Sequence, residues 1–331
     1  MPLVGILAHV DNSIKVLAGR RPVKPYLYAP TDPTPYFMQV VVYSKILKEQ
    51  DIPHVQHLFD ALQDFGINAY VHKPYLRQLE GHIDFKRGVG VFEGYVDFSV
   101  KQFDFFITLG GDGTILHATT EVRDSGVPIV GINLGRLGFL ASIEKTRIRT
   151  ALQQIVNGQF RYEHRRLLYL ESNLPLFGKN NFALNDMTLL KRDTSSMITI
   201  HTYINGDYLN SYWADGIIVS TPTGSTGYSL SCGGPIVFPD SGNFVITPVA
   251  PHNLNVRPIV IPDDSIISFE IEGRAENFLC TLDSRFETIT KKHVLAVRRA
   301  DFSIRLVQLQ NADFMETLRN KLTWGMDRRN H

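Results

Sequence analysis

The chain has 331 residues, of which 44% are hydrophobic and 20% charged, and its formal net charge is +1. This composition is typical of a globular protein in water, and the length exceeds what one hydrophobic core usually organises, so we expect two domains. The balanced charge gives no general reason to expect binding to nucleic acid or to a membrane. With only two cysteines, Cys232 and Cys280, and no metal-ligand spacing, neither a disulfide framework nor a zinc site is expected.

The first fifty residues contain little regular pattern. The start, MPLVGILAHV, lacks the charged beginning and long apolar core of a signal peptide, and no run of about 18 apolar residues occurs elsewhere, so we expect a cytoplasmic protein. Leu3 to Ala8 predicts a short strand. From His9 to about Glu49, five prolines exclude long regular elements. This loop also carries several basic residues, and it is either a lid over a phosphate site or a solvated insertion.

Helical and strand patterns alternate over the next hundred residues. Apolar residues at helical spacing over 52–65 end at Gly66. Three strand candidates follow this helix, at 67–71, 103–109 and 127–132. A further amphipathic helix is expected over 143–156. This order predicts an open, Rossmann-like α/β sheet, whose ligands bind at the carboxyl ends of the strands.

The stretch FDFFITLGGDGTILHA holds the clearest functional signal in this half. Its buried strand stops at Gly110 and Gly111, whose missing Cβ atoms allow a sharp turn that sets backbone N–H groups against an anion. Asp112 or Thr114 is expected to cap the helix that follows, and the positive end of that helix lies beside the turn. The pattern predicts a place to hold phosphate next to a base, although a plain strand-to-helix connection has the same residues.

A second glycine-rich turn, GINLGRLG, includes the end of the strand at 127–132. Asn133 stands where the middle glycine of a dinucleotide fingerprint belongs, so we do not assign that motif, and the sequence contains no P-loop motif. If the protein binds ATP, other turns must hold the phosphates. Arg136 is either a phosphate clamp or a surface arginine.

Beyond Arg161 the apolar pattern changes from a period of 3.6 to a period of 2. The expected strands lie at 167–170, 182–190, 197–204, 208–213, 217–220, 259–261, 266–271, 278–282, 287–289, 294–298 and 303–307. Asn205-Gly206 predicts a hairpin between two of them. This half is therefore expected to be nearly all β, with a closing helix over 312–322. We place the α/β domain at 1–145, completed by a C-terminal helix within 311–325, and the β-rich domain at 146–310.

Two polar clusters interrupt the β-rich half. Asn185-Asp186 lies within an apolar run, where a buried carboxylate must meet a partner or face a cleft. The segment PTGSTG, from Pro222 to Gly227, offers hydroxyls and flexible backbone amides that suit hydrogen bonding to a nucleotide, or simply form a Ser/Thr-rich turn. A serine-hydrolase motif is not matched, because Ser231 stands where its second glycine belongs.

Four motifs together resemble those of the NAD kinase family, in the same order over about residues 103–324. They are GGDGT at 110–114, NLGRLGFL at 133–140, LND at 184–186 and ADGIIVSTPTGSTGYSLSCGGP at 214–235. Lipid kinases and phosphofructokinases share the first motif but not the last in this form. The resemblance implies transfer of phosphate from ATP to the 2′-hydroxyl of the adenosine ribose of NAD, giving NADP. It also implies assembly into a homodimer or homotetramer.

The resemblance assigns roles to individual residues. Asp112 is the expected catalytic base, since transfer to a sugar hydroxyl needs a carboxylate that accepts its proton. Magnesium is expected to arrive with ATP rather than in an all-protein site. Asn185 and Asp186 are expected to hold the ribose region, and Asp215 and Ser231 the adenine. The expected substrate-binding residues are Gly111, Gly113, Asn185, Asp186, Asp215, Thr223, Thr226, Gly227, Tyr228, Ser231 and Asp283.

Two positions depart from the family pattern. Asp283 is followed by Ser284 where the family commonly has glycine, and serine would resist a positive φ there. Asp186 stands where glutamate is common. Two other functions stay open: a lipid or sugar kinase of the same superfamily, and a dinucleotide-binding regulator without turnover. The presence of Asp112 favours an enzyme, because a pure binder needs no base there.

Overall fold

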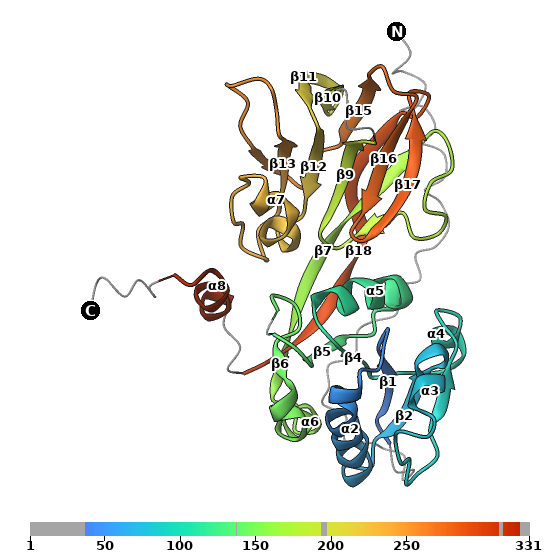
Figure 1. Cartoon of the computed structure of the whole chain (residues 1–331). Helices are drawn as coiled ribbons and strands as arrows, with labels where there is room; N and C mark the ends of the chain where they lie inside the picture. Colours follow the sequence, from blue (N-terminus) through green and yellow to red (C-terminus); the bar gives the residue numbers. More distant parts are fainter. Residues whose placement is uncertain (1–36, 137, 193–196, 311–313, 325–331) are drawn as a thin grey trace, which may run out of the picture. The chain divides into compact units, whose positions relative to one another are not determined.

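The computed structural model describes residues 37–136, 138–192, 197–310 and 314–324 (Figure 1). The strand expected at Leu3–Ala8 and the loop as far as Tyr36 lie outside these ranges. The described α-helices are α2 (Ile52–Asp64), α3 (Lys73–Leu79), α4 (Asp97–Val100), α5 (Asp112–Val122), α6 (Ile148–Val156), α7 (Tyr228–Ser231) and α8 (Phe314–Leu322).

The described strands form two sheets, of twelve and six strands. In chain order they are β1 (Gln39–Tyr43), β2 (Asn68–His72), β3 (Gly90–Phe92), β4 (Phe105–Leu109), β5 (Ile129–Asn133), β6 (Ile143–Glu144), β7 (Phe160–Ser172), β8 (Phe182–Ala183), β9 (Asp186–Lys191), β10 (Ile198–Ile204), β11 (Asp207–Ala214), β12 (Gly216–Ser220), β13 (Asn243–Val249), β14 (Ile259–Pro262), β15 (Ile267–Glu272), β16 (Asn277–Leu282), β17 (Arg285–Thr290) and β18 (Leu295–Leu309).

The first half is built on parallel strands in the order β3-β2-β1-β4-β5. The chain moves outward from β1 to β2 and β3, and then returns to β4 on the other side of β1. This reversal makes a topological switch point between β1 and β4, where open α/β sheets bind their ligands. Lys45 and Gly110 follow the carboxyl ends of these two strands.

Strand β1 contradicts the expectation that residues 9–49 form a loop. It reads QVVVY and begins after the last proline of that segment, Pro35. Its three valines are at most 1% exposed, and β-branched side chains favour a strand in such surroundings. The prolines before it therefore concealed a central strand.

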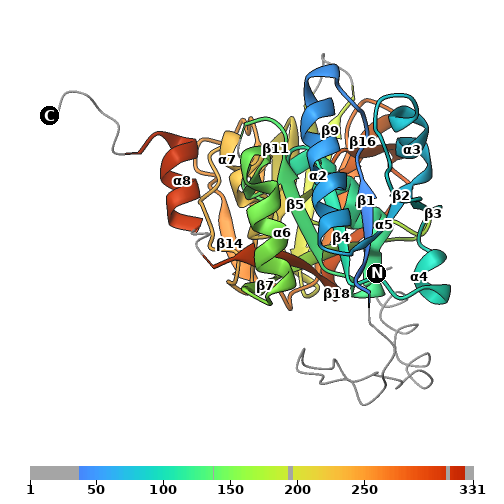
Figure 2. The ribbon, with the colours of Figure 1, turned by 90° about the horizontal axis from the view of Figure 1, so that it is seen from below.

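Helices cover both faces of this sheet (Figure 2). Helices α2, α3 and α6 pack with Val40 and Val42 on one face, whereas α5 packs with Val41 and Phe106 on the other. Neighbouring residues of a strand point to opposite faces, so the valines of β1 supply both layers. The predicted α/β half with an open sheet is confirmed.

A long antiparallel ribbon of β7 and β18 joins the two halves (Figure 1). Strand β18 contributes Val307 and Leu309 to the core of the α/β half and Leu295 and Val297 to that of the β-rich half. It also pairs with β5 in parallel and with β15 in antiparallel fashion. The ribbon thus ties the two halves to each other. The domain boundary that we expect at 145–146 stays a prediction.

The β-rich half confirms the change of period. Asn205 and Gly206 both have positive φ, 53° and 90°, and they connect β10 to β11 as the predicted hairpin. Strand β13 was missed, as were β3 and α3. The runs expected at 294–298 and 303–307 are one strand, β18, and Ile143 lies in β6 rather than in the helix expected from that residue.

Gly216, at the start of β12, packs too closely for a side chain. A Cβ there would overlap the backbone oxygen of Leu189 on the neighbouring strand β9. We therefore expect Gly216→Ala to lower the free energy of unfolding by about 1–3 kcal/mol, because the strands must separate to admit the methyl group. Urea denaturation measures this. Gly88→Ala is the matched control, since nothing lies within 4 Å of its Cβ position, and an equal loss there would contradict the packing argument.

Candidate active site

The glycine turn after β4 leads directly into α5. Gly110 has φ of +150°, and a Cβ on it would overlap the side chain of Thr114. Gly111 is the N-cap in an extended conformation, and no side chain caps the helix. The expectation that Asp112 or Thr114 caps α5 is therefore wrong. The first backbone amides of the helix have no side-chain acceptor. They are therefore available to donate hydrogen bonds to an anion at the turn.

The side chain of Asp112 instead holds the loop after β5. Its Oδ2 accepts the N–H of Phe139 at 2.8 Å, and its Oδ1 accepts the N–H groups of Leu140 and Ala141 at 3.0 Å each. Gly138 makes this contact possible, because a Cβ there would overlap the carboxylate. We call residues 139–141 the amide strap. The strap holds the carboxylate in one orientation beside the glycine turn.

A basic cluster lies at the switch point. Ser44 Oγ donates to the carbonyl of Leu109 at 2.7 Å, which ties the ends of β1 and β4 together. Lys45 Nζ contacts His117 Nε2 on α5. Burial and the neighbouring cations Lys45 and Arg285 lower the pKa of His117, so the imidazole is neutral at pH 7. Its ring nitrogen also lies 3.3 Å from Ser284 Oγ, and this contact joins α5 to the turn between β16 and β17.

The turn that carries Ser284 organises the LND segment. Asp283 accepts the backbone N–H groups of Leu184, Asn185 and Asp186 at 3.0, 2.7 and 3.3 Å. The residue with positive φ is Asp283 itself, at 54°, and not Ser284. The expected strain at serine is therefore absent from Ser284, since aspartate is among the residues that tolerate this conformation.

Asp186 lies buried beside Asp283. Burial and the neighbouring Asp283 carboxylate raise the pKa of Asp186 to about 7. Burial also raises the pKa of the Tyr228 hydroxyl, with smaller contributions from Cys232, Asp186 and Asp215. Asp215 itself pairs with Lys191 at 2.5 Å.

The segment PTGSTG packs against the LND segment. Thr221 Oγ1 donates to the carbonyl oxygen of Leu184 at 2.6 Å. The backbone N–H of Thr221 donates to the carbonyl oxygen of Asn185 at 2.9 Å. Gly224 is required because a Cβ would overlap the backbone of Asn185. Thr223 is buried and accepts a hydrogen bond from Arg165 Nη1 at 3.3 Å. The two polar clusters seen in the sequence thus form one site.

The predicted residues fall into two linked groups. Gly111, Asp112 and Gly113 lie at the start of α5. The remaining predicted residues, Asn185, Asp186, Asp215, Thr223, Thr226, Gly227, Tyr228, Ser231 and Asp283, lie in the β-rich half. Ser231 is exposed, and its hydroxyl has no recorded hydrogen-bond partner among the described residues. The binding roles of all these residues stay predictions.

Several residues of this region carried no signal in the sequence. Lys45 and His117 are ordinary side chains that the topology brings to the switch point. Arg165 and Gln308 are buried polar residues of the ribbon. Of these four residues, the alternation of apolar and polar side chains along a strand could have indicated only Arg165. It lies two residues before Leu167, on the same buried face of β7.

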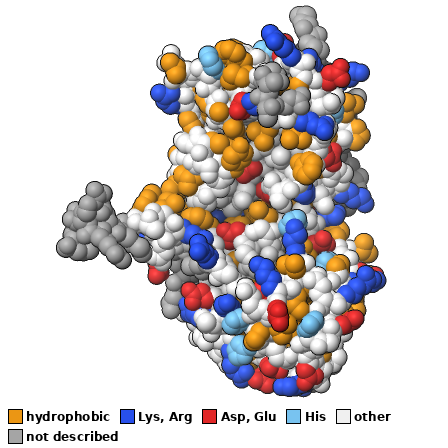
Figure 3. Space-filling model, viewed as in Figure 1, with side chains coloured by type: hydrophobic (Ala, Val, Ile, Leu, Met, Phe, Trp, Pro, Cys, Tyr) orange, Lys and Arg blue, Asp and Glu red, His pale blue; other side chains and the backbone are white. Residues whose placement is uncertain are grey.

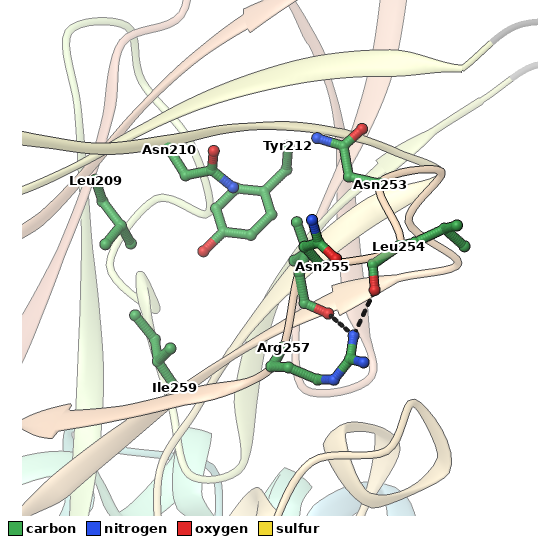
Figure 4. Close-up of a pocket in the computed structure, with 9 residues that line it drawn as sticks. Leu209, Asn210, Tyr212, Asn253, Leu254, Asn255, Arg257 and Ile259 are labelled. Atoms are coloured by element: carbon green, nitrogen blue, oxygen red, sulfur yellow. Dashed lines mark hydrogen bonds between the residues drawn. The ribbon is translucent and has the colours of Figure 1, made fainter.

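A separate groove lies on the β-rich half (Figure 4). It has a volume of about 570 Å³, and none of the predicted site residues lines it. Leu254, which lines it, is 88% exposed. Trp213 is 45% exposed, and its ring centroid lies 4.3 Å from that of His252. Apolar side chains also gather on this half in the space-filling view (Figure 3).

The described residues contain no group of three or more histidine, cysteine or acidic side chains arranged to hold a metal ion. Within the same ranges, no helix has the length and apolar character needed to cross a membrane.

Two family models match this chain. One, described as the ATP-NAD kinase N-terminal domain, matches residues 4–160, and the other, described as the ATP-NAD kinase C-terminal domain, matches residues 184–309. The NAD kinase of Cytophaga hutchinsonii is 48% identical over 294 residues, which cover 88% of this chain and all of that protein. The NAD kinase of Flavobacterium psychrophilum is 44% identical over 295 residues, with the same coverage.

Two solved structures share the fold. The yeast NADH kinase complexed with NADH has a TM-score of 0.76 at 23% identity, over 87% of this chain and 88% of that one. An NAD kinase from Archaeoglobus fulgidus in complex with ATP has a TM-score of 0.65 at 24% identity, over 87% of this chain and 99% of that one.

The raised pKa of Asp186 predicts a pH-dependent stability. Between its ordinary value of 3.8 and about 7 the folded chain binds this proton more tightly than the unfolded chain, so this contribution to the free energy of unfolding falls as pH rises. Asp186→Asn removes it. The stability of the variant relative to wild type should therefore rise by about 1–3 kcal/mol from pH 5 to pH 8. Urea denaturation at both pH values measures this, with exposed Asp207→Asn as control. Parallel profiles for wild type and Asp186→Asn would contradict it.

Proposed function

The chain belongs to the ATP-NAD kinase family, and on this premise we propose that it transfers the γ-phosphate of ATP to the 2′-hydroxyl of the adenosine ribose of NAD, giving NADP and ADP. One observation carries the proposal: a glycine turn at a sheet switch point is linked by His117 and Ser284 to the LND and PTGSTG segments. We propose that the protein acts in the cytoplasm and serves NADP biosynthesis.

Asp112 is the proposed catalytic base. The ribose hydroxyl loses its proton as its oxygen attacks the γ-phosphorus, and the carboxylate accepts that proton. Both carboxylate oxygens already accept hydrogen bonds from the amide strap. A carboxylate has about four lone-pair sites, so one is left for the ribose hydroxyl. Because the strap fixes the orientation of the carboxylate, little reorientation is needed when NAD arrives.

The triphosphate of ATP is proposed to lie over the glycine turn. Gly111 and Gly113 offer backbone amides beside the positive end of α5. Lys45 supplies a positive charge, and it forms no ion pair with a carboxylate of the described residues. Mg²⁺ is proposed to enter with ATP, because this ion keeps several waters and binds mainly through substrate phosphates. It would neutralise charge on the transferring phosphate.

The proposed NAD site is the paired LND and PTGSTG segments. Asn185 and Asp186 are proposed to hold the ribose, and Asp215 and Ser231 the adenine. The remaining contacts are assigned to Thr223, Thr226, Gly227 and Tyr228. Asp283 already accepts three backbone amides of its own chain, so we propose that it serves NAD by holding the LND turn.

The direct test is NADP formation from NAD, ATP and Mg²⁺. Wild type should produce NADP only when all three are present. Asp112→Asn should bind NAD but lose at least about 100-fold in kcat, because an amide cannot take the proton. NAD binding without NADP formation by wild type would contradict the kinase proposal and favour a binding protein.

The amide strap gives this test a matched pair of variants. Gly138→Ala places a methyl group against the Asp112 carboxylate, so kcat should fall by about 10- to 100-fold. Gly135→Ala lies in the same loop, and its Cβ would meet only Asn133 Oδ1, at 3.8 Å. It should keep wild-type kcat. Equal effects of the two substitutions would show that kcat responds to the loop in general and not to the Asp112 contact.

We also propose a homodimer or homotetramer, as expected from the family resemblance. The exposed Leu254 and Trp213 beside the groove support this, since burying them against a second copy removes apolar surface from water. Size-exclusion chromatography with light scattering should give a multiple of 37.4 kDa. Leu254→Ser should shift the equilibrium toward monomer, whereas exposed Val96→Ser should not. A monomeric wild type would contradict this part.

A further inference from the structure

A chain of side-chain hydrogen bonds runs through the β7–β18 ribbon, from the PTGSTG segment to the end of the amide strap. We call it the polar relay. Its members, in order, are Thr223, Arg165, Glu163, Gln308 and Ser142. Ser142 directly follows the strap that holds the Asp112 carboxylate. The relay therefore links two parts of the proposed active site that lie in different halves of the chain.

The first half of the relay centres on a buried arginine. The Arg165 side chain is 4% exposed, and its Nη2 lies 2.8 Å from Glu163 Oε2. Its Nη1 donates to Thr223 Oγ1 at 3.3 Å. No acceptor is recorded for the hydroxyl hydrogen of Thr223 among the described residues, so this hydrogen is available to a ligand. A buried charge of this kind is costly unless it is paired and hydrogen-bonded.

The second half of the relay has a defined direction. Gln308 Nε2 donates at 2.9 Å to the same Glu163 oxygen that Arg165 contacts. Ser142 Oγ donates to Gln308 Oε1 at 3.1 Å. The opposite orientation of the amide would set its oxygen against the Glu163 carboxylate. The ion pair thus fixes the amide of Gln308, and the amide fixes the hydroxyl of Ser142.

Hydrogen bonds in such a chain polarise one another, most strongly where water is excluded. Gln308 is 6% and Thr223 7% exposed. A ligand oxygen that accepts the Thr223 hydrogen makes Thr223 Oγ1 a better acceptor for Arg165. Because Arg165 then donates less strongly to Glu163, Glu163 Oε2 becomes a better acceptor for Gln308 Nε2. The Gln308 amide in turn becomes a better acceptor for Ser142, the residue that follows the strap.

We infer that Arg165 and Gln308 are positioning residues, through which NAD bound at Thr223 tightens the amide strap around the Asp112 carboxylate. The inference rests on the proposed function, because it takes NAD as the ligand and Asp112 as the base. It adds that the acceptor substrate strengthens the hold of the strap on a carboxylate that the strap already orients.

Hydrogen–deuterium exchange tests the relay without turnover. Saturating NAD, added to wild type without ATP, should slow exchange of the amides of residues 139–141 by at least about threefold. In Gln308→Met, which keeps the side-chain length but cannot hydrogen-bond to Glu163 or Ser142, NAD should still bind with a Kd within about twofold of wild type. The slowing of the strap should be lost.

Kinetics supply a second readout. Gln308→Met should lower kcat by about 10-fold or more and leave the Kd for NAD and the unfolding midpoint nearly unchanged. Arg165→Lys keeps the charge beside Glu163 and loses the fork that also reaches Thr223, so it avoids stranding a buried carboxylate. It should lower kcat similarly. The double variant should be no slower than the slower single variant, because both substitutions break the same chain.

Control variants separate the relay from general loss of buried polar groups. Gln154→Met on α6 and Thr202→Val on β10 each remove a buried polar atom that has no recorded partner. Both should keep wild-type kcat and the NAD-dependent slowing. If NAD binds wild type and leaves strap exchange unchanged, or if Gln308→Met keeps wild-type kcat, the relay inference is overturned alone. If wild type neither binds NAD nor forms NADP, the proposed function falls and the inference with it.

Discussion

The hydrogen bonds between one carboxylate and three consecutive backbone amides are the constraint on which the proposed active site depends. Asp112 begins α5, and the amides of Phe139, Leu140 and Ala141 follow β5. The contact therefore joins the carboxyl ends of two neighbouring strands, β4 and β5. It places the only acid of the glycine turn in a fixed orientation, and charge-assisted bonds of this kind are among the stronger ones in proteins.

The second constraint is the ribbon that carries both halves of the molecule. Because β18 contributes side chains to both hydrophobic cores, displacement of one half strains the other. The same ribbon buries the polar side chains of Arg165 and Gln308. A ribbon that is shared by both hydrophobic cores explains how the glycine turn and the PTGSTG segment, about 110 residues apart in the sequence, keep one geometry.

Local patterns in the sequence predicted the elements and the motifs but not the long-range contacts. The glycine turn and the Asn205-Gly206 hairpin could be predicted because both need residues with positive φ, which glycine and asparagine adopt most readily. Asp112 was expected to cap its own helix, whereas its partners lie 27 to 29 residues away. The relay could not be predicted from local patterns, because Gln308 and Glu163 are 145 residues apart. Strand β1 escaped because the composition of the residues before it suggested a loop.

The most direct measurement is hydrogen–deuterium exchange of residues 139–141 in wild type and in Asp112→Ala. Removal of the carboxylate deprives three amides of their acceptor at once, so exchange of this segment should be at least about 10-fold faster in the variant. Exchange in β4 and in the β-rich half should be unchanged. If the strap exchanges at the same rate in both proteins, the carboxylate does not hold it, and the account of how the base is oriented is wrong.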